Sequence, residues 1–254
     1  MYKDLLTLAQ KVGTEAGALL MDRPLAFEIE SKSTAIDIAT QMDTKAEKFI
    51  VESLLAARPD DGIIGEEGAS IESKSGITWV IDPLDGTVNY FYGLPGWNVS
   101  IAAKDSEGVI VGVVTAPTIN STWWATRGGG AFYNGHAIKC NDPVELDRAL
   151  IATGFQYDVA HRVTQLEDFS KLVPIVRDLR RNGAAAVDLC HVAMGALDGY
   201  YEAGLKEWDW SAGGLVATEA GATFKQYGQN PMRISMAAGP HLHSQLESHL
   251  GFRD

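Results

Sequence analysis

The chain has 254 residues, 46% of them apolar and 21% charged, which is the composition of a globular protein large enough to bury a substantial core. Its formal net charge of −12 argues against nucleic acid as a partner, because phosphate backbones are bound by basic surfaces. An acidic protein that handles an anionic substrate needs local positive charge, which a bound metal ion would provide.

The two cysteines, Cys140 and Cys190, lie far apart and belong to no CxxC or paired Cys/His spacing. A disulfide framework and a zinc site are therefore not expected. The first residues include an acid and no signal-type apolar stretch, and no apolar run approaches the length of a membrane span. We expect a cytoplasmic protein without a membrane partner.

Apolar residues at helical spacing predict two helices near the N-terminus, at 3–21 and 40–57, with a proline shortly after each. Short apolar runs at 63–64 and 77–81 come next. Three β-strands separated by turn signals then follow, at 99–103, 109–115 and 122–126.

The pattern changes after residue 141. Strands are expected at 149–153 and 199–202, and helices at 162–179, 184–194, 208–220 and 241–250. The helix at 162–179 is expected to bend at Pro174. Each half combines a sheet with helices. The sequence therefore predicts an α+β protein with layered elements and two parts, residues 1–141 and 142–254.

Five carboxylates stand at the edges of three apolar runs: Glu66, Glu67, Asp82, Asp85 and Asp209. Their segments read IIGEE, WVIDPLDGT and WDWSAG, and none of them contains Lys or Arg. Carboxylates at the ends of buried strands or in tight turns are costly unless positive charge compensates them. A hard divalent cation with oxygen ligands is the simplest compensation, so the pattern indicates metal-assisted phosphate chemistry.

The hexapeptide DPLDGT concentrates this chemistry. An apolar strand delivers Asp82 to the sheet end, and the proline after it forces the chain to turn. Asp82 and Asp85 would then converge with the Leu84 carbonyl between them, while Gly86 and Thr87 open a helix whose free amides face an anion. The alternative is an ordinary turn in which the second aspartate caps the helix. The conjunction with the other two segments favours the metal site.

The other candidates each have a structural alternative. Glu66, followed by Glu67, is either a metal ligand or a solvated strand end. Asp209 either closes the metal site or caps the helix that begins there. Asp43 either pairs with the Thr87 hydroxyl to orient a water molecule, or completes a capping box that begins at residue 40.

Lys32 is either an ordinary loop lysine or a mobile contact near the metals. His191 falls mid-helix among apolar residues, where a core or interface role is expected. No Ser–His–Asp order comes with a nucleophile elbow, and neither cysteine has an activating neighbour. A covalent mechanism is therefore disfavoured.

These residues resemble the inositol monophosphatase family of lithium-sensitive, magnesium-dependent phosphatases. The segments GEE, DPLDGTVNY and WDWSAG carry the match, and the last two resemble the family's two signatures. Further similarity runs through 128–135, 180–186 and 200–204. The resemblance covers nearly the whole chain and implies a layered α-β-α-β-α sugar-phosphatase fold. Residues 1–141 would carry most metal ligands, and 142–254 would carry Asp209 and the substrate contacts.

The resemblance implies two or three Mg²⁺ ions. Glu66, Asp82 and the Leu84 carbonyl would hold the first, and Asp82, Asp85 and Asp209 the second. Glu66 would also reach a third, weaker ion through water. Phosphate monoester hydrolysis would then proceed by metal-activated water without a covalent intermediate.

The resemblance also assigns the remaining roles. Thr87 with Asp43 would position the attacking water, so that these two residues and Glu66 are the expected catalytic residues. The expected contacts to phosphate and to the substrate hydroxyls are Asp85, Gly86, Thr87, the Ala185 backbone and Glu202.

The implied substrate is a small phosphorylated polyol, with myo-inositol 1-phosphate as the first choice. The family often carries Thr where Ala184 stands and His where Lys206 stands, and Lys206 would favour a second anionic group. Histidinol phosphate, fructose 1,6-bisphosphate and 3′-phosphoadenosine phosphates are therefore alternative substrates. Outside the enzyme class, the alternative is a non-catalytic regulator that binds a protein or RNA.

The family commonly forms homodimers, so a homodimer is expected here. The apolar helix at 184–194 would help to form that contact unless it packs in the core, the residues in question being Val187, Cys190, His191 and Met194.

Overall fold

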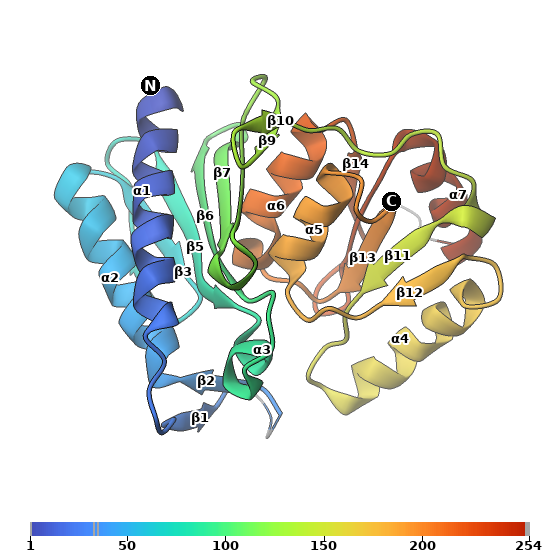
Figure 1. Ribbon diagram of the computed structural model, residues 1–254, viewed down its shortest axis with the longest axis horizontal. Helices are drawn as coiled ribbons and strands as arrows, with labels where there is room; N and C mark the ends of the chain where they lie inside the picture. Colours follow the sequence, from blue (N-terminus) through green and yellow to red (C-terminus); the bar gives the residue numbers. More distant parts are fainter. Residues whose placement is uncertain (1, 33, 35, 252–254) are drawn as a thin grey trace.

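The computed structural model describes residues 2–32, 34 and 36–251, and Figure 1 shows the course of the chain. The elements up to residue 137 are α1 (Tyr2–Met21), β1 (Ile29–Ser31), β2 (Ile38–Thr40), α2 (Gln41–Ala57), β3 (Gly62–Gly65), β4 (Ser70–Ile71), β5 (Thr78–Asp85), α3 (Thr87–Tyr92), β6 (Asn98–Asp105), β7 (Gly108–Ala116), β8 (Ser121–Thr126), β9 (Ala131–Tyr133) and β10 (His136–Ala137). The later elements are β11 (Leu150–Thr153), α4 (Val159–Leu172), β12 (Asp178–Arg180), α5 (Ala185–Ala193), β13 (Gly199–Ala203), α6 (Glu207–Glu219), β14 (Thr223–Tyr227), β15 (Ile234–Ala238) and α7 (Pro240–Leu250).

The larger sheet has eight strands in the order β10-β9-β8-β7-β6-β5-β3-β4. All neighbours run antiparallel except β3 and β5, which are parallel. The central strands β6 and β7 are buried along nearly their whole length. Strands covered on both faces have continuous apolar sequences, which explains why the runs at 99–103 and 109–115 show little alternation.

The smaller sheet has five strands in the order β12-β11-β13-β15-β14. β11 runs parallel to both β12 and β13, and β15 runs antiparallel to β13 and β14. The last residues of β13 lead directly into α6. This order therefore carries Glu202 and Asp209, which are close in sequence, to the same end of the sheet.

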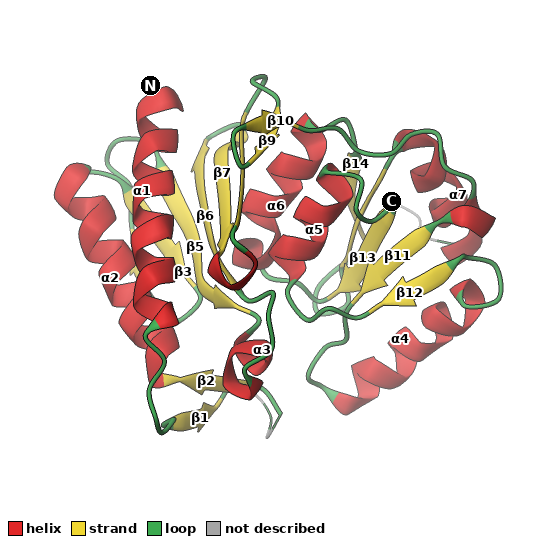
Figure 2. Cartoon of the chain, viewed as in Figure 1, coloured by secondary structure: helices red, strands yellow, loops and turns green. Residues whose placement is uncertain are grey.

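The layers alternate between helices and sheets (Figure 2). α1 and α2 cover the outer face of the larger sheet, α5 and α6 lie between the two sheets, and α4 and α7 cover the outer face of the smaller one. α6 lies directly on β7, where a Cβ atom at Gly112 would stand 2.7 Å from the Ala212 carbonyl oxygen. The layered α-β-α-β-α fold expected from the resemblance is confirmed.

Most expected helices and strands are found within one or two residues of their predicted ends, but the helix at 162–179 is wrong. α4 ends at Leu172, and residues 178–180 form β12, in which Leu179 pairs with Ile151. Pro174 has no amide proton and cannot continue the helix, so that it ends the helix rather than bending it. β14 and β15 were not expected, because the residues around them lack strong alternation.

α5 packs in the core rather than presenting an apolar face to solvent. Val187 and Cys190 are buried between the two sheets, and Met194 packs against the same cluster. Core packing, the alternative given for this helix, therefore holds for Val187 and Cys190, whereas His191 and Met194 are only partly buried and the contact with a second copy stays a prediction. The strands of the two sheets fall on either side of residue 141, but the division of the chain into two parts at that point stays a prediction.

Among the helices formed by residues 2–32, 34 and 36–251, none combines the length and apolar character needed to cross a membrane.

Candidate active site

A pocket of about 430 Å³ opens where the ends of the two sheets meet α5 and α6. Nine of the ten residues expected in the site line it, and Asp43 lies just behind it: the nine are Glu66, Asp82, Leu84, Asp85, Gly86, Thr87, Ala185, Glu202 and Asp209. A second hollow, of about 570 Å³, lies between 145–147 and α7 and contains none of them. The sequence therefore identified residues that folding gathers from both halves of the chain.

The DPLDGT segment lines the pocket at the end of β5. The chain turn expected after Asp82 is wrong, because the strand continues to Asp85, which still pairs with Asn98, and only its register shifts between Asp82 and Asp85. Within this irregular stretch, Asp82 Oδ1 accepts a hydrogen bond from the Leu84 amide at 3.0 Å. Gly86 has φ = 91°, a left-handed conformation that glycine adopts at little cost. A Cβ atom there would also stand 3.2 Å from the Gly183 carbonyl oxygen. α3 then begins at Thr87 without a side-chain cap. The interpretation of Asp85 as the cap of this helix is therefore wrong.

Asp85 instead binds the start of α5. Its carboxylate accepts hydrogen bonds from the amides of Ala185 at 3.2 Å and Ala186 at 2.9 Å, and from Asn98 Nδ2 at 2.8 Å. The N-cap of α5 is Ala184, which has no side-chain acceptor, so Asp85 satisfies these free amides from across the fold. Burial raises the pKa of Asp85 to about 6, against the lowering effect of these hydrogen bonds.

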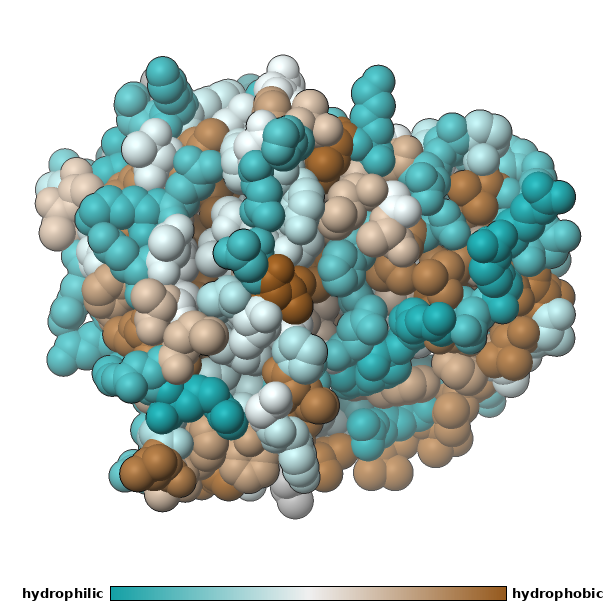
Figure 3. Space-filling model, viewed as in Figure 1, coloured by the Kyte–Doolittle hydropathy of each residue, from teal (hydrophilic) through white to brown (hydrophobic). Residues whose placement is uncertain are grey.

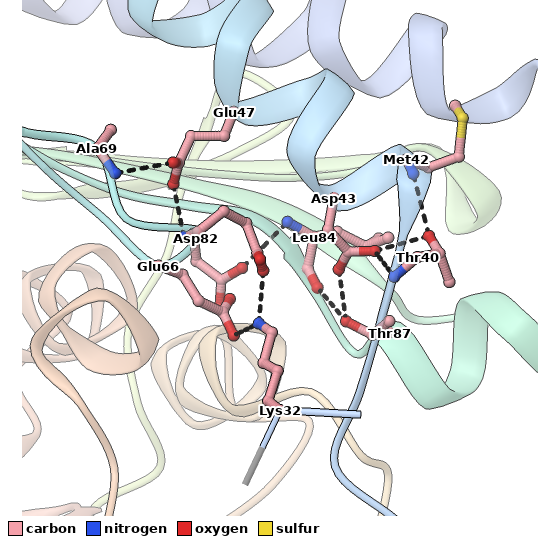
Figure 4. A network of polar contacts seen from close by, with 11 residues as sticks. Lys32, Thr40, Met42, Asp43, Glu47, Glu66, Ala69, Asp82, Leu84 and Thr87 are labelled. Carbon is pink, nitrogen blue, oxygen red and sulfur yellow. Dashed lines mark hydrogen bonds and ion pairs between the residues drawn. The ribbon is translucent and has the colours of Figure 1, made fainter. Parts of the chain in front are cut away.

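Asp43 serves two partners at once. Its Oδ2 accepts hydrogen bonds from the Thr40 amide at 2.8 Å and hydroxyl at 2.7 Å, completing the capping box of α2. Its Oδ1 accepts the Thr87 hydroxyl at 2.8 Å, and this hydroxyl also lies 3.1 Å from the Leu84 carbonyl oxygen (Figure 4). The two alternatives for Asp43 are therefore both present. Burial raises the pKa of Asp43, although the hydrogen bonds from Thr40 and Thr87 oppose the rise.

Glu66 reaches the pocket from the turn after β3, where it meets Lys32. The Lys32 ammonium lies 2.8 Å from Glu66 Oε1 and also pairs with Glu67 (Figure 4). Burial alone would lower the pKa of Lys32. The charges of Glu66 and Glu67 outweigh this effect, so that the pKa of Lys32 lies above its usual value. Burial likewise raises the pKa of Glu67 to about 7, against the pull of Lys32.

Asp209 occupies the third position of α6. Its Oδ2 accepts a hydrogen bond from the Lys206 amide at 2.6 Å, while Lys206 itself is the N-cap residue. The interpretation of Asp209 as an N-cap is therefore wrong in detail, although the residue does stabilise the helix start. Burial, followed by the charges of Glu66 and Asp85, raises the pKa of Asp209 well above its usual range.

The acidic residues destabilise one another's charges. Burial raises the pKa of Asp82 well above normal, and the charges of Glu66, Asp85 and Asp209 raise it further. Two charges about 4 Å apart at an effective dielectric of 20 interact by roughly 4 kcal/mol. Within the described part of the chain, no three Asp, Glu, His or Cys side chains are already arranged to hold a metal ion. The oxygen donors nevertheless fit a hard cation, because they face one pocket and, among the ion pairs between described residues, only that of Glu66 with Lys32 involves any of them.

Glu202 enters the pocket from β13 of the smaller sheet. It shares a face of β13 with Tyr200, whose hydroxyl donates to Glu202 Oε2 at 2.6 Å. Burial raises the pKa of Glu202 to about 6, against the lowering effects of Tyr200 and of the Arg181 charge. A Cβ atom at Gly154 would collide with this carboxylate, so glycine there leaves the space that Glu202 occupies.

Comparison with known proteins agrees with this geometry. The profile of the Inositol monophosphatase family matches residues 1–251. The chain belongs to this family.

Among relatives, the inositol-1-monophosphatase SuhB of Mycobacterium tuberculosis is 42% identical over 203 residues, which cover 76% of this chain and 70% of the relative. The Nus factor SuhB of Escherichia coli is 37% identical over 228 residues, covering 88% and 85%. The crystal structure of the suppressor protein SuhB of Bartonella henselae superimposes with a TM-score of 0.91 at 33% identity and covers 97% of this chain and 98% of that one. Family membership confirms the expected enzyme class, a phosphoric monoester hydrolase.

Sequence reasoning missed one residue that holds the family's GEE segment in place. Glu47 in α2 is buried and accepts hydrogen bonds from the amides of Glu67 at 2.8 Å and Ala69 at 3.0 Å (Figure 4). Gly65 leaves room for it, since a Cβ atom there would collide with the Glu47 carboxylate. The only sequence signal was an acid on the inward face of an amphipathic helix.

The protein's stability should depend on pH through two buried carboxyls that are not expected metal ligands, Asp188 and Glu202. Burial raises the pKa of Asp188 to about 8, and that of Glu202 lies at about 6. Both lie above the value of about 4 expected in the unfolded chain, so the folded state binds more protons and loses stability as pH rises through roughly 5 to 8. In EDTA, the protein should melt several degrees higher at pH 5.5 than at pH 8, since about 1 kcal/mol shifts Tm by roughly 2–4 °C at this size.

Calorimetry of the metal-free protein across this pH range measures the effect. The Asp188→Asn variant is the matched control, because it removes one of the titrations of the buried carboxyls while keeping a hydrogen-bond acceptor. Its Tm should vary less above pH 7. A melting temperature that rises steadily from pH 5.5 to 8 would contradict the raised pKa values.

Proposed function

We propose that this protein hydrolyses the phosphate monoester of a small polyol, with myo-inositol 1-phosphate as the first choice, in a Mg²⁺-dependent reaction without a covalent intermediate. One observation carries the proposal. A single pocket presents a cluster of carboxylates, of which Glu66 pairs with Lys32, beside a helix start, together with the buried Glu202 carboxylate, which accepts a hydrogen bond from Tyr200. A phosphoryl group matches the carboxylate cluster with its cations and the helix start, and sugar-like hydroxyls match Glu202.

The ligands proposed for the ions are those that the family resemblance implies. Glu66, Asp82 and the Leu84 carbonyl would hold one Mg²⁺, and Asp82, Asp85 and Asp209 a second, with Glu66 reaching a third ion through water. When bound, the ions supply positive charge that activates water and stabilises the leaving oxygen. Lys32, which pairs with Glu66 here, would have to give up this contact as a cation enters.

Thr87 and Asp43 would handle the proton of the attacking water. The Thr87 hydroxyl donates to Asp43, which leaves the lone pairs of its oxygen free to accept a hydrogen bond from water. The raised pKa of Asp43 makes it a better acceptor for that proton. The amides of Gly86 and Thr87, at the start of α3, would bind the phosphate oxygens.

In the same pocket, Glu202 would accept hydrogen bonds from the substrate hydroxyls, and the Ala185 backbone and Asp85 would contribute to the same contacts. Arg181, Lys206 and His161 also line the pocket. Lys206 would favour a second anionic group, so bisphosphates belong in any test of specificity.

Phosphate release from a set of esters tests the proposal: myo-inositol 1-phosphate, histidinol phosphate, fructose 1,6-bisphosphate and 3′-phosphoadenosine 5′-phosphate, each with Mg²⁺ and with EDTA. The expected result is highest kcat/KM for the inositol ester, loss of turnover in EDTA, and inhibition by tens of millimolar LiCl. If another ester had the highest kcat/KM, that ester would replace myo-inositol 1-phosphate as the proposed substrate. Metal-independent turnover would refute the mechanism.

A second candidate function is regulatory binding, favoured by the relatives named Nus factor. A non-catalytic regulator would be expected to lose a ligand or to carry a basic face. This chain keeps every proposed ligand and has a net charge of −12. Binding of a protein or RNA without any phosphatase activity would support this alternative.

The homodimer and the cytoplasmic location also belong to the proposal. With α5 buried, the apolar side chains available for a self-contact include a stripe along α4, toward the lower edge in Figure 3: Val159, Val163 and Leu166, exposed by 70, 59 and 52%. Sedimentation of the purified protein measures the oligomeric state, and a monomer at micromolar concentration would contradict the dimer.

A further inference from the structure

Asn182 does not line the pocket but bonds to two helices whose first residues do. It precedes the Gly183–Ala184 turn that leads into α5, and both residues of that turn line the pocket. We propose that Asn182 is a positioning residue that fixes the Ala185 backbone, called here the hydroxyl end, relative to the Gly86 and Thr87 amides, called the phosphate end, and that it thereby sets the preference for polyol phosphates over phosphate esters without hydroxyl groups. This inference rests on the proposed function.

One contact ties Asn182 to the phosphate end. Asn89, 7% exposed and in the helix that begins at Thr87, donates from Nδ2 to the Asn182 carbonyl oxygen at 2.8 Å. The two segments touch closely here, because a Cβ atom at Gly86 would stand 3.2 Å from the Gly183 carbonyl oxygen and one at Gly183 would stand 3.0 Å from Asn89 Oδ1. A shift of the Gly183–Ala184 turn would therefore displace Gly86.

A second contact ties Asn182 to the hydroxyl end. Its Nδ2 donates to Asp188 Oδ1 at 2.6 Å. Asp188 is 2% exposed, and its amide donates to the Ala184 carbonyl oxygen at 3.1 Å. The Asn182 side chain is thus anchored to the first turn of α5, whose leading amides hold Asp85.

These contacts define what Asn182 does in chemical terms. Its carbonyl is bound to the helix that starts the phosphate cradle, and its side chain is bound to the helix that starts the hydroxyl subsite. Asn89, Asn182 and Asp188 are all absent from the pocket lining. Loosening the link would leave each subsite intact but change the spacing between them. A substrate that occupies both ends would lose rate, and one that occupies only the phosphate end would not.

The test compares two substrates on one variant. Asn182→Ala removes the side-chain bond and keeps the backbone carbonyl. For myo-inositol 1-phosphate, kcat/KM should fall about tenfold or more, since small displacements of a bound substrate can cost up to about a hundredfold. For 4-nitrophenyl phosphate, which has no hydroxyl to place, kcat/KM should change less than about twofold. Asn182→Gln, which displaces the amide by one methylene, should show the same selective loss.

Asp188→Asn is the conservative variant, because its side-chain oxygen still accepts the bond from Asn182, and it should keep the wild-type ratio between the two substrates. Equal losses on both substrates, or an unchanged ratio in Asn182→Ala and Asn182→Gln, would overturn the positioning role alone. A wild-type enzyme that does not prefer the polyol ester would overturn the proposed function and this inference with it.

Discussion

Replacing Asp82 with Asn is expected to abolish phosphatase activity while leaving the protein folded. Asp82 is the carboxylate shared by both proposed ions, and an amide oxygen carries no charge with which to hold them. The loss in kcat should be about a thousandfold or greater, the scale on which preorganised charge stabilises transition states. The fold should tolerate the change, because burial and the acidic neighbours of Asp82 destabilise its charged form, and asparagine carries no charge.

The decisive readout combines activity with melting. Wild-type protein should gain several degrees in Tm from millimolar Mg²⁺, since a ligand that binds only the folded state stabilises it. Asp82→Asn should lose this gain, and in EDTA it should melt at or above the wild-type temperature. Asp188→Asn, another buried carboxyl changed to an amide, should retain the Mg²⁺ response. An active Asp82→Asn enzyme, or a wild-type Tm that does not change on addition of Mg²⁺, would refute the metal site.

Thr87→Val should cost about a hundredfold to ten-thousandfold in kcat, the usual contribution of a positioned proton-transfer group. Valine has nearly the same shape as threonine but can neither donate to Asp43 nor accept a hydrogen bond from water. KM should stay within a few-fold, because the Thr87 backbone amide proposed to bind phosphate is retained.

Thr87→Ser and a double variant separate this role from packing. Serine keeps the hydroxyl and should recover most of the activity. Asp43→Asn should lose activity by a similar factor, and adding it to Thr87→Val should cost little more, since residues that act as one unit are not additive. Independent, multiplicative losses would show that the 2.8 Å bond between them has no part in proton handling.

Much of the site could be predicted from sequence because its ligands adjoin strong local signals. Asp82 and Asp85 follow an apolar strand and flank a proline, and Asp209 stands at a helix start between two tryptophans. Such positions are set by the short-range pattern, and the separate segments then point to one another through their shared chemistry. The family resemblance supplied the role of Glu202.

The residues that were missed act through tertiary packing. Glu47 looked like any acid on an amphipathic helix, and only the folded chain shows that it receives two amides from the turn after β3. Asn182 gave no signal either, since its partners lie in two different helices. The two alternatives for α5 were left open for the same reason, because an apolar helix face predicts burial but not whether the partner is a sheet of the same chain or a second copy.

The placement of α6 has a consequence for synthesis on the ribosome. This helix covers one face of the eight-stranded sheet, yet it begins some 70 residues after that sheet's last strand, β10. A nascent chain that has completed the sheet still exposes the side chains destined for that face, such as Val114 and Ala125, which are fully buried at the end. Until Glu207 to Glu219 have left the exit tunnel, the chain needs protection from aggregation, and it lacks Asp209.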